Sequence, residues 1–397
     1  MGQTTRGVSL LGSTGSIGTQ ALAVIASQPG RFAVTGLAAG QGRLRSLAEQ
    51  AAQFRPSRIA VPTDDAAATV SRHLAAFGVQ DEYHPRIEAG PEAAAKLAGA
   101  GTDVVLNSMA GAAGLEPTLA ALTAGSSLAL ANKESLVVGG ALVKAAVQRP
   151  GQIIPVDSEH SAIAQCLRAG SGQEVASLIL TASGGPFRGA TLEQLRHVSP
   201  QQALKHPTWR MGPLVTCNSA TLINKALELI EAHLLFDIAP ERIEVVVHPQ
   251  SIVHSMVRFI DGAVIAQASP PDMRLPIALA LSWPERMPQI VPKLDWAAPT
   301  SWGFEPVDNT VFPAVELGRE AIRRSPLHPA VLNGANEVLV EGFLAGRLPF
   351  LGITEGVGRL LDAFQSSVHP GEVPSLEEIK SADAWARQQA GRLVEGA

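Results

Sequence analysis

The stretch at residues 10–22, LLGSTGSIGTQAL, decides the prediction of the fold. Its glycines, Gly12, Gly15 and Gly18, follow the apolar run 8–11 and precede a run typical of a helix. Backbone amides at the amino end of a helix attract phosphate groups, and glycine lets the backbone approach them closely. The spacing G-x-x-G-x-x-G departs from the usual G-x-G-x-x-G, and an ordinary strand-to-helix turn is the alternative. The position, between a first strand and a first helix, favours the pyrophosphate of a dinucleotide.

Alternating strands and helices surround this loop. Alanine-rich helical stretches separate six short apolar runs, at residues 8–12, 32–39, 58–62, 103–109, 127–132 and 152–157. Strands that alternate with helices of crossover length form a parallel sheet with helices on both faces. The sequence therefore predicts an α/β protein whose first domain, residues 1–157, is doubly wound and Rossmann-like.

The rest of the chain changes character twice. Residues 158–283 mix helices with the strand-like runs SLILTAS and IEVVVH and with a hairpin, MVRFIDGAVIAQ, whose turn is Asp261–Gly262, which predicts a central α+β catalytic domain. Prolines recur through residues 284–313, which predicts an extended linker. Residues 314–397 are helical in pattern and predict a small C-terminal helical bundle.

Composition narrows the class of function. The chain has 397 residues, 46% hydrophobic and 17% charged, with a net charge of −5, which is typical of a folded protein without a nucleic-acid surface. The two cysteines, Cys166 and Cys217, have no CxxC spacing, so we expect no disulfide or thiolate metal site and a reducing compartment. Charged residues interrupt the most apolar tract, 126–147. We therefore expect a cytoplasmic protein with a small-molecule partner and no membrane segment.

The residues after the second strand indicate which dinucleotide binds. NAD-binding chains usually carry Asp or Glu about 20 residues past the glycines, where it binds the ribose hydroxyls. Here that place reads LAAGQGRLR, residues 37–45, without a carboxylate but with Arg43 and Arg45. Arginine suits the additional 2′-phosphate of NADP, although either arginine could instead lie on a solvated helix face. The sequence favours NADPH.

Two carboxylates stand at the end of the last predicted N-terminal strand. Asp157 and Glu159 flank Ser158 in PVDSEHSAI, residues 155–163. Strand ends of open α/β sheets are where ligands bind, and paired carboxylates suit Mg²⁺ or Mn²⁺. An acidic first turn of a helix is the alternative, because it complements the helix dipole. The spacing alone leaves both interpretations open.

The stretch 218–236, NSATLINKALELIEAHLLF, predicts an amphipathic helix with Ser219 as a candidate N-cap. Its polar face contains Thr221, Asn224, Lys225, Glu228 and Glu231. A solvated surface explains such a face. However, Asn and Thr near a helix start also form anion sites, so a ligand-binding face is the second interpretation.

Two loops also have residues suited to ligands. TASGGPF, residues 181–187, places Ser183 and two glycines after a strand, suited to a phosphate or to a simple turn. KHPTWRMGP, residues 205–213, carries His206 and Trp209 between prolines, as a lid or a packed surface loop would. We expect His248 and His254, isolated strand histidines, to be structural.

Taken together, these motifs closely resemble the 1-deoxy-D-xylulose 5-phosphate reductoisomerase family. The resemblance spans nearly the whole chain in order, through LGSTGSIG, ALANKESLV, PVDSEHSAI, TASGGPF, KHPTWRMG, NSATLINKALELIEA, HPQSIVHSMV and LNGANEVLVEGFL. It implies a homodimeric enzyme of isoprenoid-precursor synthesis that uses NADPH and Mn²⁺ or Mg²⁺. The implied reaction rearranges a sugar phosphate and reduces it to 2-C-methyl-D-erythritol 4-phosphate.

The resemblance also implies roles for individual residues. Metal ligands match Asp157, Glu159 and Glu228, and these three join Lys225 and His206 as the expected catalytic residues. Expected substrate contacts are Ser158, Ser183, His206, Trp209, Gly212, Ser219, Asn224 and Lys225, with Trp209 as the lid tryptophan. Expected cofactor contacts are Thr14, Gly15, Ser16, Ile17, Gly40, Gln41, Gly42, Asn132, Lys133 and Glu134.

One departure from the family concerns the 2′-phosphate. The family often carries a basic residue and an asparagine where this chain has Gln41 and Gly42, so we expect Arg43 or Arg45 to replace that contact. Two other functions are compatible with the domain order: an NADP-dependent dehydrogenase without skeletal rearrangement, and a non-catalytic NADPH-sensing protein. The sequence does not choose between Mg²⁺ and Mn²⁺, between stepwise and concerted rearrangement, or between degrees of lid closure.

Overall fold

The computed structural model describes residues 5–79, 82–209 and 211–396, which form two compact units. The first unit comprises Met1–Ser135, Ala146–Ser161 and Asp272–Pro292. The second comprises Leu136–Ala145, Ala162–Pro271 and Lys293–Ala397. Each unit has its own β-sheet and is described separately.

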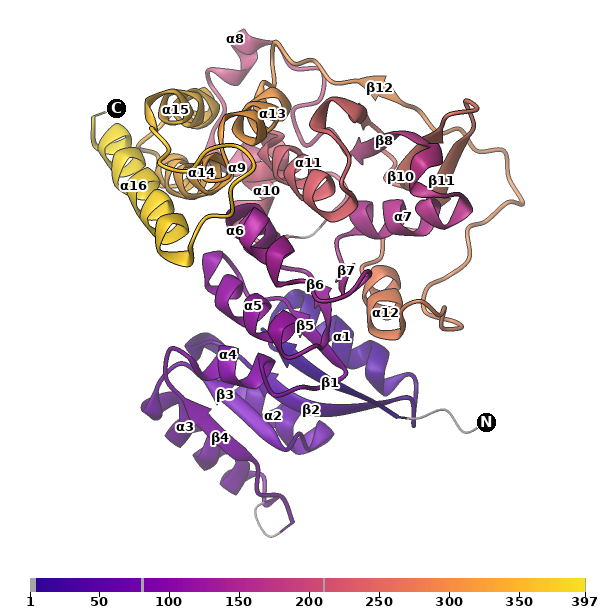
Figure 1. Cartoon of the computed structure of the whole chain (residues 1–397), viewed down its shortest axis with the longest axis vertical. Helices are drawn as coiled ribbons and strands as arrows, with labels where there is room; N and C mark the ends of the chain where they lie inside the picture. Colours follow the sequence, from indigo (N-terminus) through magenta and orange to yellow (C-terminus); the bar gives the residue numbers. More distant parts are fainter. Residues whose placement is uncertain (1–4, 80–81, 210, 397) are drawn as a thin grey trace. The chain divides into compact units, whose positions relative to one another are not determined.

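The first unit contains a seven-stranded parallel sheet in the order β4-β3-β2-β1-β5-β6-β7 (Figure 1). Its strands are β1 (Arg6–Leu11), β2 (Phe32–Ala38), β3 (Arg58–Val61), β4 (Arg86–Ala89), β5 (Val104–Asn107), β6 (Ser127–Leu130) and β7 (Ile153–Pro155). The order reverses between β1 and β5, and the glycine stretch follows β1 at this switch point. The predicted doubly wound α/β fold is confirmed.

Helices cover this sheet because their apolar faces match its buried strands. They are α1 (Ser16–Ala26), α2 (Leu44–Phe54), α3 (Asp64–Ala76), α4 (Ala93–Ala98), α5 (Leu115–Thr123) and α12 (Arg274–Ser282), with 3₁₀ turns at Gln41–Arg43 and Ala112–Gly114. Leu10 and Leu106 from the strands share one core with Ile25 of α1 and Leu281 of α12. That shared core joins α12, from late in the chain, to the sheet.

The sequence predicted six strands here, and β4 was missed. This edge strand reads Arg86, Ile87, Glu88, Ala89, so it has no apolar run. Glu88 pairs with Arg58 of β3 at 2.8 Å and with Arg86 at 2.9 Å. Charged side chains are common on edge strands, where they discourage pairing with another chain.

The second unit contains a five-stranded mixed sheet in the order β11-β10-β8-β9-β12. Its strands are β8 (Val175–Ala182), β9 (Ile243–Val247), β10 (Val253–Phe259), β11 (Val264–Ala268) and β12 (Glu305–Pro306). The predicted hairpin is β10–β11: Phe259 N donates to Ala263 O at 2.8 Å, and Gly262 has a φ of 90°. The α+β prediction for this segment is confirmed.

The remaining helices belong wholly or mostly to the second unit. They are α6 (Lys133–Ala146), α7 (Ser158–Cys166), α8 (Leu192–Leu195), α9 (Pro200–Ala203), α10 (Pro213–Ala220), α11 (Ile223–Phe236), α13 (Ala314–Arg324), α14 (His328–Leu344), α15 (Phe350–Ala363) and α16 (Leu376–Glu395), with 3₁₀ turns at Leu167–Ala169, Gly172–Glu174 and Pro240–Arg242. Helix α14 packs against α15 and α16, and α13 packs against α11 (Figure 1). The predicted C-terminal helices are therefore present as a bundle.

The boundaries of the two units differ from the predicted domain limits. Helix α12 and residues up to Pro292 belong with the first unit, whereas Leu136–Ala145 belongs with the second. The C-terminal helices join the mixed sheet in one unit. Within residues 284–313 no described segment is α-helical, as the prolines predicted, but Glu305–Pro306 pairs with β9. Local composition does not reveal which of two cores an apolar helix joins.

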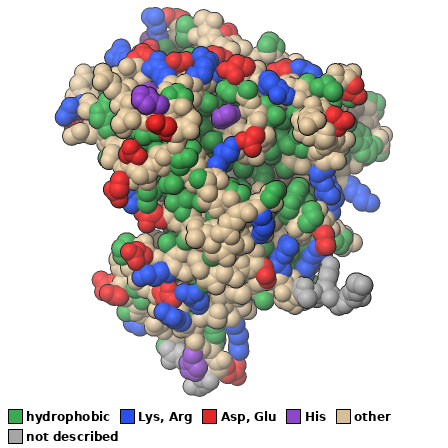
Figure 2. Space-filling model, viewed as in Figure 1, with side chains coloured by type: hydrophobic (Ala, Val, Ile, Leu, Met, Phe, Trp, Pro, Cys, Tyr) green, Lys and Arg blue, Asp and Glu red, His purple; other side chains and the backbone are tan. Residues whose placement is uncertain are grey.

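The face drawn in Figure 2 carries acidic and basic side chains interspersed with one another. This mixture agrees with the small net charge of −5. None of the described helices combines the length and hydropathy that crossing a membrane requires.

Candidate active site

The glycine stretch forms a tight turn between β1 and α1. Gly12 has a φ of 79°, and a Cβ there would lie 2.6 Å from Ser108 O. A Cβ at Gly18 would lie 2.5 Å from Gly12 O, so this glycine lets the helix pack onto the turn. Gly15 is the N-cap of α1 and no described side chain caps the helix. The amino end of α1 therefore presents backbone N–H groups to an anion.

The loop after β2 is tied to this turn by Arg43. Its guanidinium donates to Thr14 O at 2.8 Å, and Gln41 Nε2 donates to Thr63 Oγ1 at 3.3 Å. Arg45, by contrast, pairs with Glu49 at 3.1 Å and is largely exposed. Of the two arginines considered for the 2′-phosphate, Arg43 is the one bonded to the glycine turn. The other expected cofactor positions lie on the same two segments: Gly15, Ser16 and Ile17 at the start of α1, and Gly40 and Gly42 in the exposed loop.

The side chain of Asn132 joins the start of α6 to the loop after β5 through hydrogen bonds. Its amide nitrogen donates to Met109 O at 2.7 Å and to Gly111 O at 3.0 Å, and its side-chain oxygen accepts from Ser135 N at 2.8 Å. It is 2% exposed. Asn132 thus caps α6 and holds the loop after β5, which places Lys133 and Glu134 on the first turn of α6.

Asp157 lies at the amino end of α7. Its Oδ1 accepts from Glu159 N at 3.2 Å, so it caps the helix, and Glu159 is the acidic first-turn residue that the helix-start interpretation expected. The Oδ2 of Asp157 accepts from the ammonium of Lys133. The buried ring of His160 faces the same carboxylate, with Nδ1 3.5 Å from Oδ1. His160 was not singled out by the sequence analysis; its spacing of three residues from Asp157 on a helix was the available signal.

The polar face of α11 is buried. Glu228 is 1% exposed and accepts hydrogen bonds from the side chains of Asn224 and Lys225. Lys225 is 3% and Glu231 4% exposed. The interpretation of this face as a solvated surface is therefore wrong, because the C-terminal helices and α10 enclose α11.

The expected N-cap at Ser219 is also wrong. Ser219 lies inside α10, and α11 begins at Ile223 after Leu222, which has a φ of 59°. This left-handed residue splits the run that periodicity alone joins into one helix. Asn224 and Lys225 consequently occupy the first turn of a separate helix.

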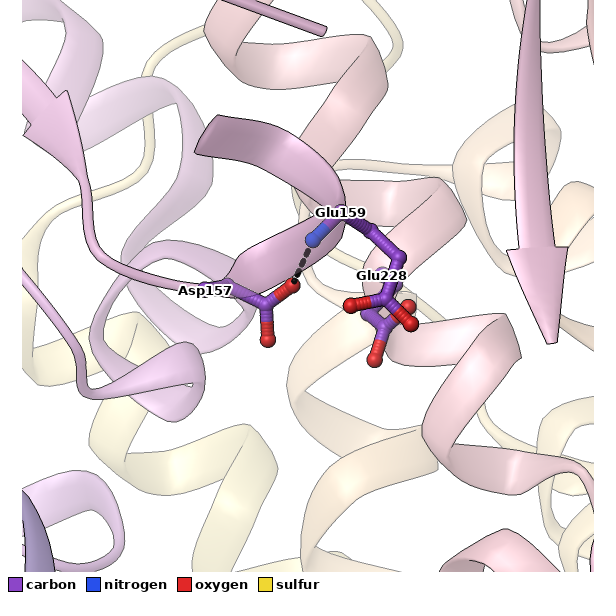
Figure 3. Close-up of side chains that lie close together, drawn as sticks. All are labelled: Asp157, Glu159 and Glu228. Carbon is purple, nitrogen blue, oxygen red and sulfur yellow. Dashed lines mark hydrogen bonds between the residues drawn. The ribbon is translucent and has the colours of Figure 1, made fainter. Parts of the chain in front are cut away.

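Asp157, Glu159 and Glu228 bring one carboxylate oxygen each within 4.8 Å of one another (Figure 3). Figure 3 shows the three carboxylate groups gathered at the start of α7. Oxygen ligands at about 2.1 Å from an octahedral cation lie about 3–4 Å apart, so this group fits a divalent cation after small adjustments. An all-oxygen donor set favours Mg²⁺ or Mn²⁺.

Ser183 and His206 meet at the end of β8. The ring nitrogen Nε2 lies 3.0 Å from Ser183 Oγ, while Nδ1 accepts from Thr208 N at 3.1 Å and Trp209 N at 2.9 Å. Because Nδ1 is an acceptor, the neutral ring has its proton on Nε2 and donates it toward Ser183. Burial lowers the pKa of His206 below its ordinary value. The imidazole is thus a neutral hydrogen-bond donor at this position.

The remaining substrate candidates lie on several segments. A Cβ on Gly185 would be 2.6 Å from Ser219 O, so the glycine pair brings the loop of Ser183 against α10. Gly212 is the N-cap of α10, and the ring of Trp209 lies 6.4 Å from that of His254. Ser158, at the start of α7, donates to Glu159. Arg210, within the predicted lid, lies outside the described residues.

A cavity of about 500 Å³ lies beside Ser183. Arg188 and Lys205 are the basic side chains among its lining residues, together with the Gly185 turn. Arg188 is paired with Glu305 at 2.6 Å, so the Ser183 hydroxyl and Lys205 are the groups of this cavity that suit an anion. The two strand histidines have bonds within the fold instead: His248 contacts Gly303 O at 2.8 Å, and His254 contacts Ser269 O at 3.2 Å.

A dinucleotide-type sheet together with three converging carboxylates defines a class, the metal- and nucleotide-dependent α/β enzymes. Comparison with known proteins identifies the family. Family models match residues 8–140 (1-deoxy-D-xylulose 5-phosphate reductoisomerase), 153–236 (the C-terminal domain of that enzyme) and 268–389 (DXP reductoisomerase C-terminal domain). The chain belongs to the 1-deoxy-D-xylulose 5-phosphate reductoisomerase family.

Individual relatives agree over the full length. The reductoisomerase of Beutenbergia cavernae is 60% identical over 392 residues, covering 98% of this chain and 97% of the relative. That of Paenarthrobacter aurescens is 55% identical over 386 residues, covering 96% of each chain. The solved Zymomonas mobilis enzyme in complex with NADPH superposes with a TM-score of 0.90 at 39% identity, covering 99% of this chain and 100% of that one. A DOX-P reductoisomerase in complex with NADPH, fosmidomycin and magnesium gives 0.89 at 37% identity and 98% coverage of both chains.

Proposed function

We propose that this chain converts 1-deoxy-D-xylulose 5-phosphate to 2-C-methyl-D-erythritol 4-phosphate with NADPH and a divalent cation. The observation that carries the proposal is the group of Asp157, Glu159 and Glu228, whose carboxylate oxygens lie within 4.8 Å of one another. A dehydrogenase that leaves the carbon skeleton intact has no need of three converging carboxylates. Full-length identity of 60% to a reductoisomerase supports the same reaction.

The charges around the carboxylates match this chemistry. Lys133 pairs with Asp157 and Lys225 with Glu228, so ammonium groups lie beside two of the three carboxylates. A divalent cation adds positive charge at this place and makes the site more attractive to an anionic sugar phosphate. When bound, the cation supplies a Lewis acid for the rearrangement and NADPH supplies the hydride for the reduction.

Side chains of the second unit hold the substrate phosphate in this proposal. Ser183 and Ser219 belong to segments in close contact, and Asn224 and Lys225 start α11. Hydroxyl, amide and ammonium groups together donate to the phosphate oxygens and compensate their charge. Lys225 is 3% exposed, so water screens the attraction between its ammonium and a bound phosphate only weakly.

His206 and Trp209 orient the substrate and exclude water. The neutral imidazole donates from Nε2, so it can bind a hydroxyl or carbonyl oxygen without releasing a proton to it. Trp209 is joined to His206 through its backbone N–H, which links closure of the tryptophan to the donor. Exclusion of water protects the reactive fragments of a rearrangement from stray protonation.

The first unit binds the dinucleotide in this proposal and also carries Asp157 and Glu159, whereas Glu228 and the residues for the substrate phosphate belong to the second unit. The amino end of α1 holds the pyrophosphate, and Arg43 provides a cation beside Thr14 for the 2′-phosphate. We propose that the protein is a homodimer, for which the exposed Ile260 and Val264 of the β10–β11 hairpin offer an apolar contact. The free, buried Cys166 and Cys217 support a reducing, cytoplasmic location.

One assay tests the reaction and its alternatives. NADPH oxidation is followed with 1-deoxy-D-xylulose 5-phosphate, with and without Mg²⁺ or Mn²⁺, and the product skeleton is determined by carbon NMR. The proposal predicts metal-dependent oxidation and a branched product. A straight-chain polyol phosphate would identify a simple reductase. NADPH binding without any turnover would identify a sensor.

A further inference from the structure

A second cavity, of about 300 Å³, lies at the amino edge of the seven-stranded sheet, opposite the edge that carries the glycine turn. It is lined by Arg6, Gly101, Thr102, Asp103, Ala124, Gly125, Ser126, Ser127 and Arg149. These residues precede or begin β1, β5, β6 and β7. All of them belong to the first unit.

Two arginines, Arg6 and Arg149, line this cavity. Among the residues that the structure describes, neither Arg6 nor Arg149 forms an ion pair, although Asp103 lines the same space. Asp103 accepts from Gly7 N at 2.7 Å, which joins β1 to β5. Arg6 donates from Nη1 to Leu281 O at 2.9 Å, and Arg149 donates from Nη2 to Ser127 Oγ at 2.9 Å. Each guanidinium therefore keeps donors for a further acceptor.

The same cavity contains a buried hydroxyl group for which the described residues provide no hydrogen-bond partner. Ser126 is 3% exposed and lines the cavity, yet its Oγ has no hydrogen-bond partner among the described residues. Buried hydroxyls are almost always bonded, because leaving one without a partner is unfavourable. A ligand in the cavity would satisfy it.

The partial negative charge at the carboxyl end of α5 does not neutralise the positive charges of the two arginines. Helix α5 ends at Thr123, and donors already satisfy its last carbonyls: Ser126 N donates to Ala121 O at 3.2 Å and Gly125 N to Leu122 O at 3.0 Å. Gln148 Nε2 donates to Thr123 O at 2.8 Å. These bonds satisfy the carbonyl groups at the carboxyl end of α5 without Arg149. Arg149 is therefore not required as a cap, and its positive charge faces the cavity.

We propose that this cavity is a binding site for a small phosphate-bearing anion, separate from the cofactor and substrate positions. Arg6 and Arg149 supply the charge and the planar donors that phosphate oxygens accept, and Ser126 supplies a hydroxyl. Inorganic phosphate and a small phosphate monoester share this chemistry. The volume of about 300 Å³ leaves room for an organic substituent on the phosphate.

The test is calorimetric titration of the whole protein with inorganic phosphate and, separately, with glycerol 3-phosphate, at constant ionic strength. The background is Lys225→Ala saturated with NADPH, in which phosphate binding at the catalytic position is weakened and the cofactor fills the anion site at the amino end of α1. We expect one saturable class of sites to remain there, and Arg149→Gln to weaken it about tenfold or more. Tighter binding of glycerol 3-phosphate than of phosphate would assign the site to a metabolite, and the reverse order to the free ion.

Two further variants separate binding from folding. Arg72→Gln is the matched control, because Arg72 is exposed in the same unit and also donates to one hydroxyl, Thr69 Oγ1, at 2.9 Å. It should leave phosphate binding unchanged. Ser126→Ala should weaken binding severalfold without lowering the thermal stability of the unliganded protein. Equal binding in Arg149→Gln and Arg72→Gln, or no saturable binding in the Lys225→Ala background, would overturn the proposal.

Discussion

Replacement of Glu228 by glutamine separates the metal hypothesis from a purely structural role. Glu228 is 1% exposed, and its two oxygens accept from Asn224 and Lys225. Glutamine keeps the size, but it turns one acceptor into a donor that faces another donor and removes the charge that balances Lys225. A lost buried hydrogen bond of this kind costs about 1–3 kcal/mol of unfolding free energy.

The effect on metal binding should be larger. The cation loses one of three charged ligands. Even outer hydrogen-bond partners of metal ligands change affinity 10–100-fold, so the Mn²⁺ concentration for half-maximal rate should rise by about 100-fold or more. The assay measures initial NADPH oxidation against Mn²⁺ concentration, with the thermal midpoint of each variant measured in the same buffer.

Glu231→Gln is the control on the same helix. Glu231 is also buried, at 4% exposure, but it is not a member of the carboxylate group. We expect a loss of stability of the same order as for Glu228→Gln, with a half-saturating Mn²⁺ concentration close to that of the parent. If both variants show the same metal requirement as the parent, or the same increased requirement, the three-carboxylate site is refuted.

Three further results are expected. Arg43→Ala should reduce the preference for NADPH over NADH by about tenfold or more, the value of a charge-assisted hydrogen bond, while Arg45→Ala, which removes an exposed pair with Glu49, should not; binding of both dinucleotides measures this. Lys225→Ala should weaken binding of the sugar phosphate and of phosphonate inhibitors and leave NADPH affinity nearly unchanged, and equal losses in a titration would misplace the phosphate site. Burial lowers the pKa of His206 in the folded protein, so as pH falls the unfolded chain binds this proton first. His206 therefore reduces the free energy of unfolding as pH falls through about 6.5. Between about pH 7.5 and 5.5, the denaturant midpoint should decline less in His206→Gln than in the parent.

The first sheet was largely predictable because its central strands are buried on both faces. Runs such as 8–12 and 103–109 are apolar for that reason, whereas the edge strand at Arg86–Ala89 alternates charged and apolar residues and gave no such signal. Helix α12 was recognisable as apolar but not as part of the first core. Most of its partners are more than 100 positions away in sequence, and periodicity contains no information about them.

The candidate site, like the first sheet, was only partly predictable from the sequence. Spacing alone left Asp157 and Glu159 between an acidic first turn of a helix and a metal pair; in the structure Asp157 caps α7, and its carboxylate lies close to those of Glu159 and Glu228. The resemblance to a family supplied Glu228 as their third partner. Burial of Glu231 could not be predicted, because a polar helix face looks the same whether water or other helices cover it.

Helix α12 belongs to the first unit although it lies late in the chain, and this order affects how the protein folds during its synthesis. The core of the first unit needs Ile277 and Leu281 of this helix, and the unit closes only at Pro292. On the ribosome, the dinucleotide sheet therefore stays without part of its apolar covering until strands β8 to β11 of the mixed sheet have been synthesised. A fragment that ends at residue 157 would leave that side of α1 in contact with water. Such a fragment should aggregate or bind chaperones, and the dinucleotide-binding unit cannot be excised as a contiguous module.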